Sequence, residues 1–295
     1  MKFKKKYKNH FLIFQRNAVL ELKEVKKKII ITQAPNLSPV QALAALKVNK
    51  SAYPTMVVDC LPHFFAGVKL PKNKIRIEEK VNATIKSEHY IDVEKNRITY
   101  FNSKGVILED LDEDIDKIGK RVFVQGLDEE SLYELDKSLF KKNYYFPRVF
   151  QLDGLIFHSC FNHYAGQLRN DYFNLVLYSN VEDHTQMSII VYSKEGIEYA
   201  ASLELMSFEE LPHKLNLMLS QIEGSLKKNI DKLQVYSEPF YSQLKAKLEA
   251  SYLAKSLTLL YEGLSPAVAD SIDESVDAEL IRQALPILDL MNKKS

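Results

Sequence analysis

The chain has 295 residues, enough for about two ordinary domains that each bury a core. Hydrophobic residues make up 46% and charged residues 27%, which is the balance of a folded protein and not of a disordered one. The formal net charge is +1, so the chain lacks the broad positive field on which non-specific nucleic-acid binding depends. We therefore expect no nucleic-acid partner.

Glycine is scarce in this sequence. An average composition would give about 20 glycines in a chain of this length, and there are 9. No two of them are adjacent or separated by a single residue. The P-loop, the dinucleotide fingerprint and the kinase glycine-rich loop all need closely spaced glycines that let backbone N–H groups approach phosphate. The sequence therefore argues against these classes of nucleotide enzyme.

Two cysteines, Cys60 and Cys160, are too few for a disulfide framework and indicate a reducing compartment. Residues 1–10 are rich in lysine, and form either a solvated tail or a contact for anionic lipid. The apolar run after them, Phe11–Phe14, is far shorter than the ~7–15 residues of a signal-peptide core, and no run approaches a membrane span. We expect a cytoplasmic protein, peripheral to a membrane at most, and leave open that the sequence is a piece of a longer one.

The first 62 residues have the pattern of a small lobe rich in β-structure. Ser38 followed by Pro39 predicts an N-cap and a first-turn proline for a helix over residues 39–47. The β-branched or apolar runs that we expect to form strands are Phe11–Phe14, Ala18–Val25, Lys28–Gln33 and Thr55–Asp59.

The second region has the β-α-β-β-α-β order of a ferredoxin-like module. Its first helix is indicated by Ile77, Val81 and Ile85, which recur every fourth residue. The expected elements are a strand at 64–70, a helix at 77–90, a hairpin at 98–108 that turns through Asn102–Gly105, a strand at 121–125, a helix from Asp128 to Asn143 and a strand at 149–152.

The third region combines strong strands with amphipathic helices. The helix that begins after Ser207 has its apolar residues on one stripe, which is typical of a core-facing helix. The expected elements are a helix at 154–164, strands at 173–179, 187–193 and 197–205, a helix from Ser207, a strand at 233–236, a helix at 240–250, a strand at 256–260 and a helix at 277–291.

This order resembles the actin-like proteins of type IV pilus and type II secretion assembly, the family of PilM, MshI and the cytoplasmic domain of GspL. The likeness covers nearly the whole chain as a pattern and not as a sharp signature. The strand pair at 173–179 and 187–193, followed by 197–205, resembles the family's second actin-like half. The segments that match its passage into an inserted subdomain, and the end of the first inserted helix, are Leu61-Pro62, Phe64-Phe65, Val68–Pro71, Glu88 and Tyr90-Ile91.

The resemblance implies an α/β fold (mixed α+β) of the actin-like, ribonuclease H-like kind, with two lobes and an inserted ferredoxin-like subdomain. The implied boundaries are residues 1–62 for the first part of the first lobe, 63–150 for the insert, 151–172 for the return to the first lobe and 173–295 for the second lobe.

Three turns depart from the nucleotide-binding members of that family, which carry acidic, small or glycine residues there. The corresponding turns are Gln15-Arg16-Asn17, Tyr178–Asp183 and Tyr236–Pro239. Side chains at these points keep the backbone from approaching phosphate, and Pro239 also lacks an N–H donor. We expect no cofactor and no catalytic residue, although Asp183 could still hold a magnesium-bound water. An active actin-like ATPase with degenerate phosphate loops stays open as the alternative.

Two C-x-x-H pairs, Cys60 with His63 and Cys160 with His163, consist of residue types that bind zinc. The plainer alternative is that both cysteines are small buried apolar residues, and we expect no metal. No G-x-S-x-G motif is present, so a hydrolase triad is not supported. The acidic stretch 109–116 is expected to be a solvated loop.

The resemblance implies a non-catalytic scaffold in a pilus or secretion platform at the inner membrane. It would bind the short cytoplasmic N-terminal segment of a PilN-like membrane protein, which would hold it at the membrane, and it would also contact the assembly ATPase. Aromatic residues flank both expected junctions of the insert, and an apolar peptide docks well among such rings. The residues expected to bind the partner are Phe64, Phe65, Tyr145 and Phe146. A third alternative is an unrelated α+β binding protein.

Overall fold

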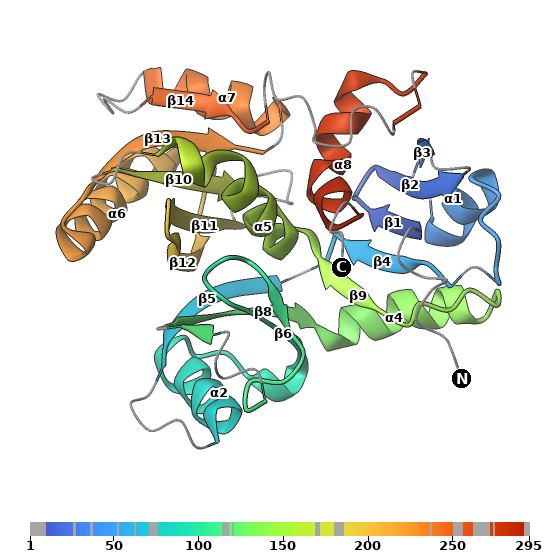
Figure 1. The fold of residues 1–295 in the computed structure, drawn as a ribbon, viewed down its shortest axis with the longest axis horizontal. Coiled ribbons are helices and arrows are strands. Elements are labelled where there is room, and N and C mark those ends of the chain that lie inside the picture. Colours follow the sequence, from blue (N-terminus) through green and yellow to red (C-terminus); the bar gives the residue numbers. More distant parts are fainter. Residues whose placement is uncertain are drawn as a thin grey trace.

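Three β-sheets make up the computed structural model of this chain, and one hydrophobic core contains residues from all three (Figure 1). Two sheets are five-stranded and mixed, and the third is four-stranded and antiparallel. No helix among the described residues is long and apolar enough to cross a membrane. The structure describes residues 10–25, 28–35, 38–51, 53–61, 63–70, 76–113, 118–119, 121–168, 172–179, 186–236, 238–249, 256–261, 272–273 and 275–291.

The first sheet has the strand order β3-β2-β1-β4-β9, with β1, β4 and β9 parallel to one another. Successive residues of β1 face opposite sides: Ile13 shares a core cluster with α8, and Phe14 shares another with α1. The Ser38 hydroxyl accepts a hydrogen bond from the first turn of α1, as predicted. The elements are β1 (His10–Phe14), β2 (Ala18–Val25), β3 (Lys28–Pro35), α1 (Pro39–Ala45), β4 (Thr55–Val58), β9 (Val149–Gln151) and α8 (Ala278–Met291).

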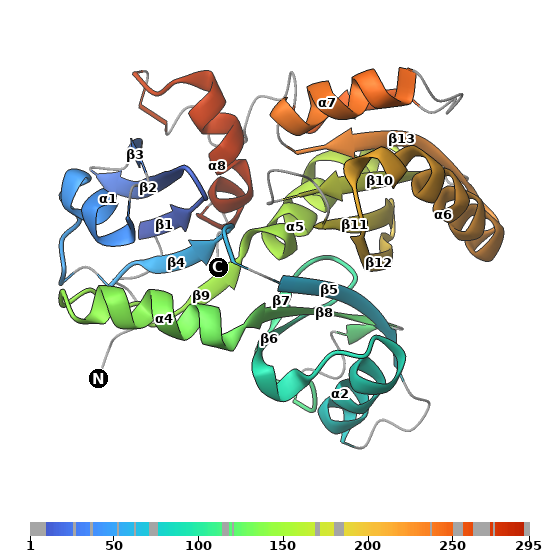
Figure 2. The same cartoon turned by 180° about the vertical axis from the view of Figure 1, so that it is seen from behind.

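The second sheet has the order β12-β11-β10-β13-β14, with β10, β13 and β14 parallel. Its one face is covered by α6 and α7, and its other face by α5, which lies between the two five-stranded sheets (Figure 2). The elements are α5 (Leu152–Tyr164), η3 (Ala165–Gln167), β10 (Tyr172–Tyr178), β11 (Gln186–Ser193), β12 (Gly196–Glu204), η4 (Phe208–Glu210), α6 (Leu211–Leu226), β13 (Asn229–Val235), α7 (Glu238–Glu249) and β14 (Ser256–Leu259).

The third sheet has the order β5-β8-β6-β7 and carries α2 on one face. The β6–β7 hairpin turns where predicted, because the Asn102 side chain accepts hydrogen bonds from the N–H groups of Lys104 and Val106. In the acidic stretch, Asp112 accepts from the Ile77 N–H at 2.7 Å and so caps α2. The elements are β5 (His63–Lys69), α2 (Ile77–Glu88), η2 (Val93–Lys95), β6 (Asn96–Phe101), β7 (Ile107–Leu108) and β8 (Arg121–Asp128).

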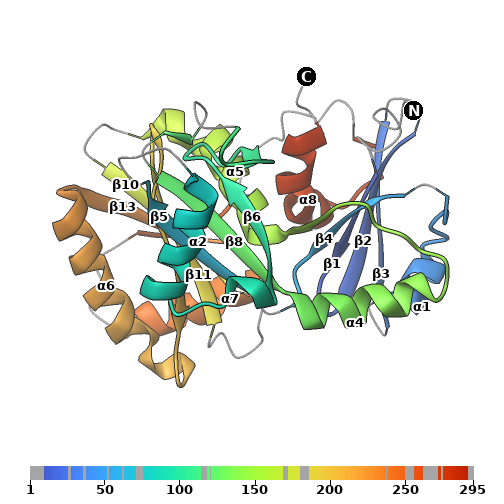
Figure 3. The ribbon, with the colours of Figure 1, turned by 90° about the horizontal axis from the view of Figure 1, so that it is seen from below.

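The predicted ferredoxin-like packing of residues 63–150 is wrong. Of the two helices predicted for this module, α2 packs on the four-stranded sheet, whereas α4 (Glu129–Phe140) runs from β8 to lie beside α1 under the first sheet (Figure 3). The strand after it, β9, pairs in parallel with β4. The physical reason is burial: Leu132, Leu135 and Leu139 cover apolar residues of β1 and β4 that α1 leaves open. The cap that begins α4, Asp128, is as predicted.

The four-stranded sheet also contacts the second sheet through its edge strand β5. The Phe65 N–H donates to the Ser202 hydroxyl at 3.0 Å, and the Ile197 N–H donates to the Ser103 carbonyl at 2.6 Å. The Phe65 ring packs against Phe157 of α5, with the ring centroids 4.5 Å apart. The module that contains β5 to β8 is therefore joined to the second sheet and to α5.

Candidate functional site

Residues at the carboxyl ends of β4, β10 and β13 lie near one another between the two five-stranded sheets. Ligands of open α/β sheets bind outside such strand ends, so this junction is a candidate binding site. Tyr178, the last residue of β10, packs against Tyr236, which follows β13, with the ring centroids 5.9 Å apart. The ring of His63 lies 6.2 Å from that of Tyr178. All three side chains are buried, so aromatic rings fill this part of the junction.

A buried polar cluster lies beside these rings. Nε2 of His63 is 3.1 Å from Oδ2 of Asp153 and 3.3 Å from the Ser188 hydroxyl, which itself donates to Asp153 Oδ2 at 2.9 Å. Nδ1 of His63 faces the Leu61 carbonyl at 3.3 Å. Directly after β4, Asp59 adds a second buried carboxyl group, whose Oδ1 has no hydrogen-bond partner among the described residues.

Burial and neighbouring charge set the protonation of this cluster. Burial raises the pKa of Asp59 well above its ordinary value; the Asp153 carboxylate adds to this effect and His63 opposes it. Burial alone would lower the pKa of His63, but the charge and hydrogen bond of Asp153 raise that pKa above its usual value. The arrangement therefore favours a protonated Asp59 next to an imidazolium that is paired with Asp153.

This cluster does not have the geometry of a hydrolase. In a Ser-His-Asp triad the imidazole lies between the other two groups and uses a different nitrogen for each. Here Ser188 and Asp153 both contact Nε2 of His63, so the imidazole is not placed to take a proton from the hydroxyl while the carboxylate orients its other nitrogen. The cluster serves as a buried polar link between β5, α5 and β11.

Tyr178 and Tyr236, with which two of the three turns singled out in the sequence begin, lie at this junction. Gln15-Arg16-Asn17 forms the tight β1–β2 turn, closed by a hydrogen bond from the Gln15 N–H to the Ala18 carbonyl. In the second turn Tyr178 and Ser179 are described, whereas residues 180–185, including Asp183, lie outside the described residues. In the third, Ser237 also lies outside them, and α7 begins at Glu238.

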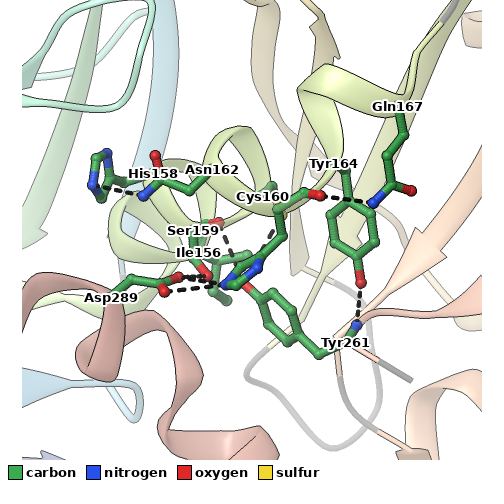
Figure 4. A network of polar contacts seen from close by, with 10 residues as sticks. Ile156, His158, Ser159, Cys160, Asn162, Tyr164, Gln167, Tyr261 and Asp289 are labelled. Carbon is green, nitrogen blue, oxygen red and sulfur yellow. Dashed lines mark hydrogen bonds and ion pairs between the residues drawn. The ribbon is translucent and has the colours of Figure 1, made fainter. Parts of the chain in front are cut away.

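A second polar network joins α5 to α8 and to the end of β14 (Figure 4). Asp289 of α8 accepts a hydrogen bond from the Ser159 hydroxyl, and both its oxygens lie 3.1 Å from Nε2 of His163. The Tyr261 N–H donates to the Tyr164 hydroxyl at 2.6 Å. Because its groups satisfy one another, we interpret this network as structural.

The two C-x-x-H pairs do not converge on a zinc site. His63 faces Asp153, and His163 faces Asp289, so the two imidazoles have different partners. Burial raises the pKa of the Cys60 thiol to about 11 and that of Cys160 further, which disfavours the thiolates that zinc requires. Within the described part of the chain, no group of three or more His, Cys, Asp and Glu residues is placed to hold a metal ion.

A groove of about 750 Å³ lies between the four-stranded sheet and the first sheet. One wall is formed by α2, η2, β6 and β7, and the other by residues 147–150, which include the start of β9. β9 is the last strand of the first sheet, and no other described strand pairs with its outer edge. Both signs of charge line the groove: Glu78, Glu94 and Glu109 against Arg97 and Arg148.

The four residues that we expected to bind a partner do not form one surface. Phe64, Phe65 and Phe146 are buried in three different core clusters, with exposed fractions of 7%, 1% and 6%. Only Tyr145 is exposed, at 51%, and it lines a separate hollow on the other side of Pro147 from the groove. The sequence did not show which of these aromatic residues lie in the core.

The sequence interpretation did not single out the polar residues that matter at the junction, Asp153 and Ser188. Ser188 did carry a usable signal, since it is a polar residue inside the otherwise apolar run Met187–Tyr192. Asp153 carried none, because an acidic residue at the start of a helix is ordinary.

No family model matches the sequence, and no curated protein matches it significantly. Solved structures do match. The chain is similar to a structure described as a PilM-PilN type IV pilus biogenesis complex, with a TM-score of 0.63 and 12% identity over 96% of this chain and 96% of that one. It is also similar to a Bacteroides thetaiotaomicron protein described as having an actin-like ATPase fold and unknown function, with a TM-score of 0.52 and 13% identity over 96% and 98%.

The fold is actin-like. It comprises two mixed sheets and one four-stranded antiparallel sheet. This confirms the actin-like fold that the resemblance implied. The cytoplasmic domain of EpsL, an inner membrane component of the type II secretion system of Vibrio cholerae, matches with a TM-score of 0.43 and 11% identity over 98% of this chain and 95% of that one, too low to indicate a shared fold by itself.

Proposed function

We propose that this chain is a non-catalytic, actin-like scaffold of a type IV pilus or type II secretion platform. In this proposal it binds the cytoplasmic N-terminal segment of a PilN-like protein in the groove between the four-stranded sheet and β9. It would lie in the cytoplasm, held at the inner membrane by that partner, with the assembly ATPase as a second partner. Support for the partner comes from the similarity to a structure described as a PilM-PilN complex.

The observation that carries the proposal is the outer edge of β9 along the groove. An edge strand offers N–H and C=O groups that an extended peptide satisfies by adding a strand, and neighbouring apolar pockets then select its side chains. The half-buried Val93, Ile98 and Ile107 supply the apolar wall opposite this edge. Because the lining carries carboxylates and guanidinium groups, a peptide with both signs of charge would find partners there.

Absence of ATP hydrolysis is the other half of the proposal. The support is steric and chemical: the rings of Tyr178 and Tyr236 fill part of the junction, and the turn at Gln15-Arg16-Asn17 presents side chains where phosphate needs bare backbone. His63, Asp153 and Ser188 satisfy one another there instead of facing a substrate.

A calorimetric titration with synthetic N-terminal peptides of candidate PilN-like proteins tests the groove. We expect the wild type to bind one of them, and Thr99→Arg, which puts a long side chain into the groove wall, to abolish binding. A peptide N-methylated at alternate residues should also fail, since it cannot pair with the β9 edge. Tyr90→Ala, at a 91% exposed residue outside the groove lining, is the control that should bind normally. Binding that survives Thr99→Arg would contradict the proposed site.

A further inference from the structure

A second hollow, of about 780 Å³, opens on the other side of Pro147 from the groove. Exposed aromatic side chains border it: Tyr53, Phe140 and Tyr145 are 39%, 63% and 51% exposed. Large side chains seldom gather on a protein surface without a partner to cover them. The hollow shares only Pro147 with the groove, so a ligand of the hollow does not depend on the proposed function.

The walls of this hollow are held by the core beneath them. Asn143, with φ 64°, ends the turn after α4, and the Tyr144 N–H donates to the Leu139 carbonyl at 3.1 Å. Tyr144 itself is buried, while the rings of Tyr53 and Tyr145 meet edge to face with their centroids 6.1 Å apart. The site is therefore formed in advance, which reduces the entropy that a ligand must lose on binding.

The charged residues in the segments that line the hollow all carry one sign. These segments, residues 50–53 and 140–147, contain Lys50, Lys141 and Lys142 and no Asp or Glu, although the whole chain has a net charge of only +1. One of these cations, Lys50 Nζ, lies 5.3 Å from the centre of the Tyr144 ring, at the wall of the hollow. None of the described lining residues is acidic.

We infer that this hollow binds an acidic peptide segment of a partner protein that carries one aromatic or large aliphatic anchor residue. The anchor packs among Tyr53, Phe140 and Tyr145, and the flanking carboxylates face the surrounding cations, of which Lys50 is nearest. A concave site favours a peptide over a flat lipid surface, because an inserted side chain fills the hollow and a bilayer does not.

Selection from a displayed library of random 12-residue peptides against the full chain tests this inference. We expect the selected peptides to be enriched in Asp and Glu around an aromatic or aliphatic residue. Synthetic versions should lose affinity about tenfold or more for the double variant Lys50→Glu with Tyr145→Ala, and should weaken as salt rises. The matched control is Lys86→Glu with Tyr90→Ala, an exposed lysine and tyrosine outside the lining, which should bind as the wild type does.

Unfolding curves of both double variants should match the wild type, since the substituted side chains are exposed. The inference is overturned if the library yields no binder, if its binders lack acidic residues, or if the Lys50→Glu, Tyr145→Ala variant holds them as tightly as the wild type. Phosphatidylserine vesicles form the last arm: tight binding to them, lost in the same variant and not matched by any peptide, would assign the surface to a membrane instead.

Discussion

The imidazole of His63 contacts groups from two other elements of the fold. It lies where a ligand would enter at the strand ends, yet it is buried and paired with Asp153 and Ser188. Both groups are provided by elements of the two five-stranded halves, α5 and β11, whereas His63 belongs to β5 of the inserted sheet. A single side chain thus links three layers of the molecule.

The raised pKa of His63 predicts a pH-dependent contribution to stability. A group whose pKa is higher in the folded than in the unfolded state stabilises the fold fully below its unfolded pKa, about 6.5 for His, and loses this contribution as pH rises through the folded pKa. His63→Gln should therefore cost more near pH 6, about 3–5 kcal/mol for a broken buried pair, than near pH 9. Urea unfolding of both proteins at the two pH values measures the difference.

The exposed His213→Gln variant is the control for that experiment, and its stability should follow the wild type at both pH values. A cost of His63→Gln that does not change with pH would show that folding leaves the pKa of His63 unshifted, and would contradict this prediction.

Gly105 tests how tightly the inserted hairpin fits against α5. Its φ is +70°, and a Cβ there would lie 2.6 Å from Cα of His158, so Gly105→Ala adds a clash with backbone to the ordinary strain. Gly119 has a similar φ, +77°, with open space around it, so Gly119→Ala should cost only the ~1–2 kcal/mol of left-handed strain. Thermal melting should place Gly105→Ala well below Gly119→Ala, and equal melting temperatures would contradict this fit.

At the scale of the elements, α4 is the one that the sequence misassigned. Its stripe of Leu132, Leu135 and Leu139 and its cap Asp128 were predictable because they are local signals, whereas the helix ends at Phe140 and not at the predicted Asn143. The sheet that this stripe covers was not predictable, because an apolar helix face has the same sequence pattern whichever sheet it packs on. The short strand β9 pairs with β4 and so places α4 on the first sheet. A three-residue strand carries no sequence pattern that identifies its partner strand.

Packing of α4 on the first sheet predicts a large effect of Leu139→Ala. This side chain is fully buried, and its removal should cost about 2–5 kcal/mol of unfolding free energy. Tyr133→Ala, on the exposed side of the same helix at 60% exposure, should change stability by less than about 0.5 kcal/mol. Denaturant unfolding curves compare the two, and a small cost at Leu139 would be inconsistent with this placement.

For the whole molecule, the order of the elements was predictable and the contacts between layers were not. Most strands of the second five-stranded sheet were predicted close to their observed positions. The reason is that Tyr172–Tyr178, Gln186–Ser193 and Gly196–Glu204 are long apolar strands. β13 begins at Asn229, which is earlier than predicted. The prediction missed this start because the first residues of the strand are mostly polar and face solvent. Whether Phe64, Phe65 and Phe146 are exposed or buried could not be predicted from the sequence. An aromatic residue at a junction has the same sequence pattern whether it faces solvent or the core.

The proposed loss of nucleotide chemistry predicts that magnesium and ATP leave the melting temperature unchanged. A ligand present at a hundred times its dissociation constant would add about 2.7 kcal/mol of stability, which differential scanning fluorimetry detects readily. The same assay with the groove-binding peptide is the positive control and should give a shift. Stabilisation by ATP would instead favour the alternative of an active ATPase with degenerate loops.

The last helix, α8, has a consequence for synthesis. Its Leu285, Ile287 and Leu288 complete a core begun by β1 and β2, the first described strands of the chain. While the ribosome is still making the second half, the opening strands expose apolar surface that nothing has yet covered. The first half can therefore close only after α8 has been synthesised, unless a chaperone covers it, and ending the chain shortly before Ala278 should yield a protein that aggregates although both five-stranded sheets are encoded in full.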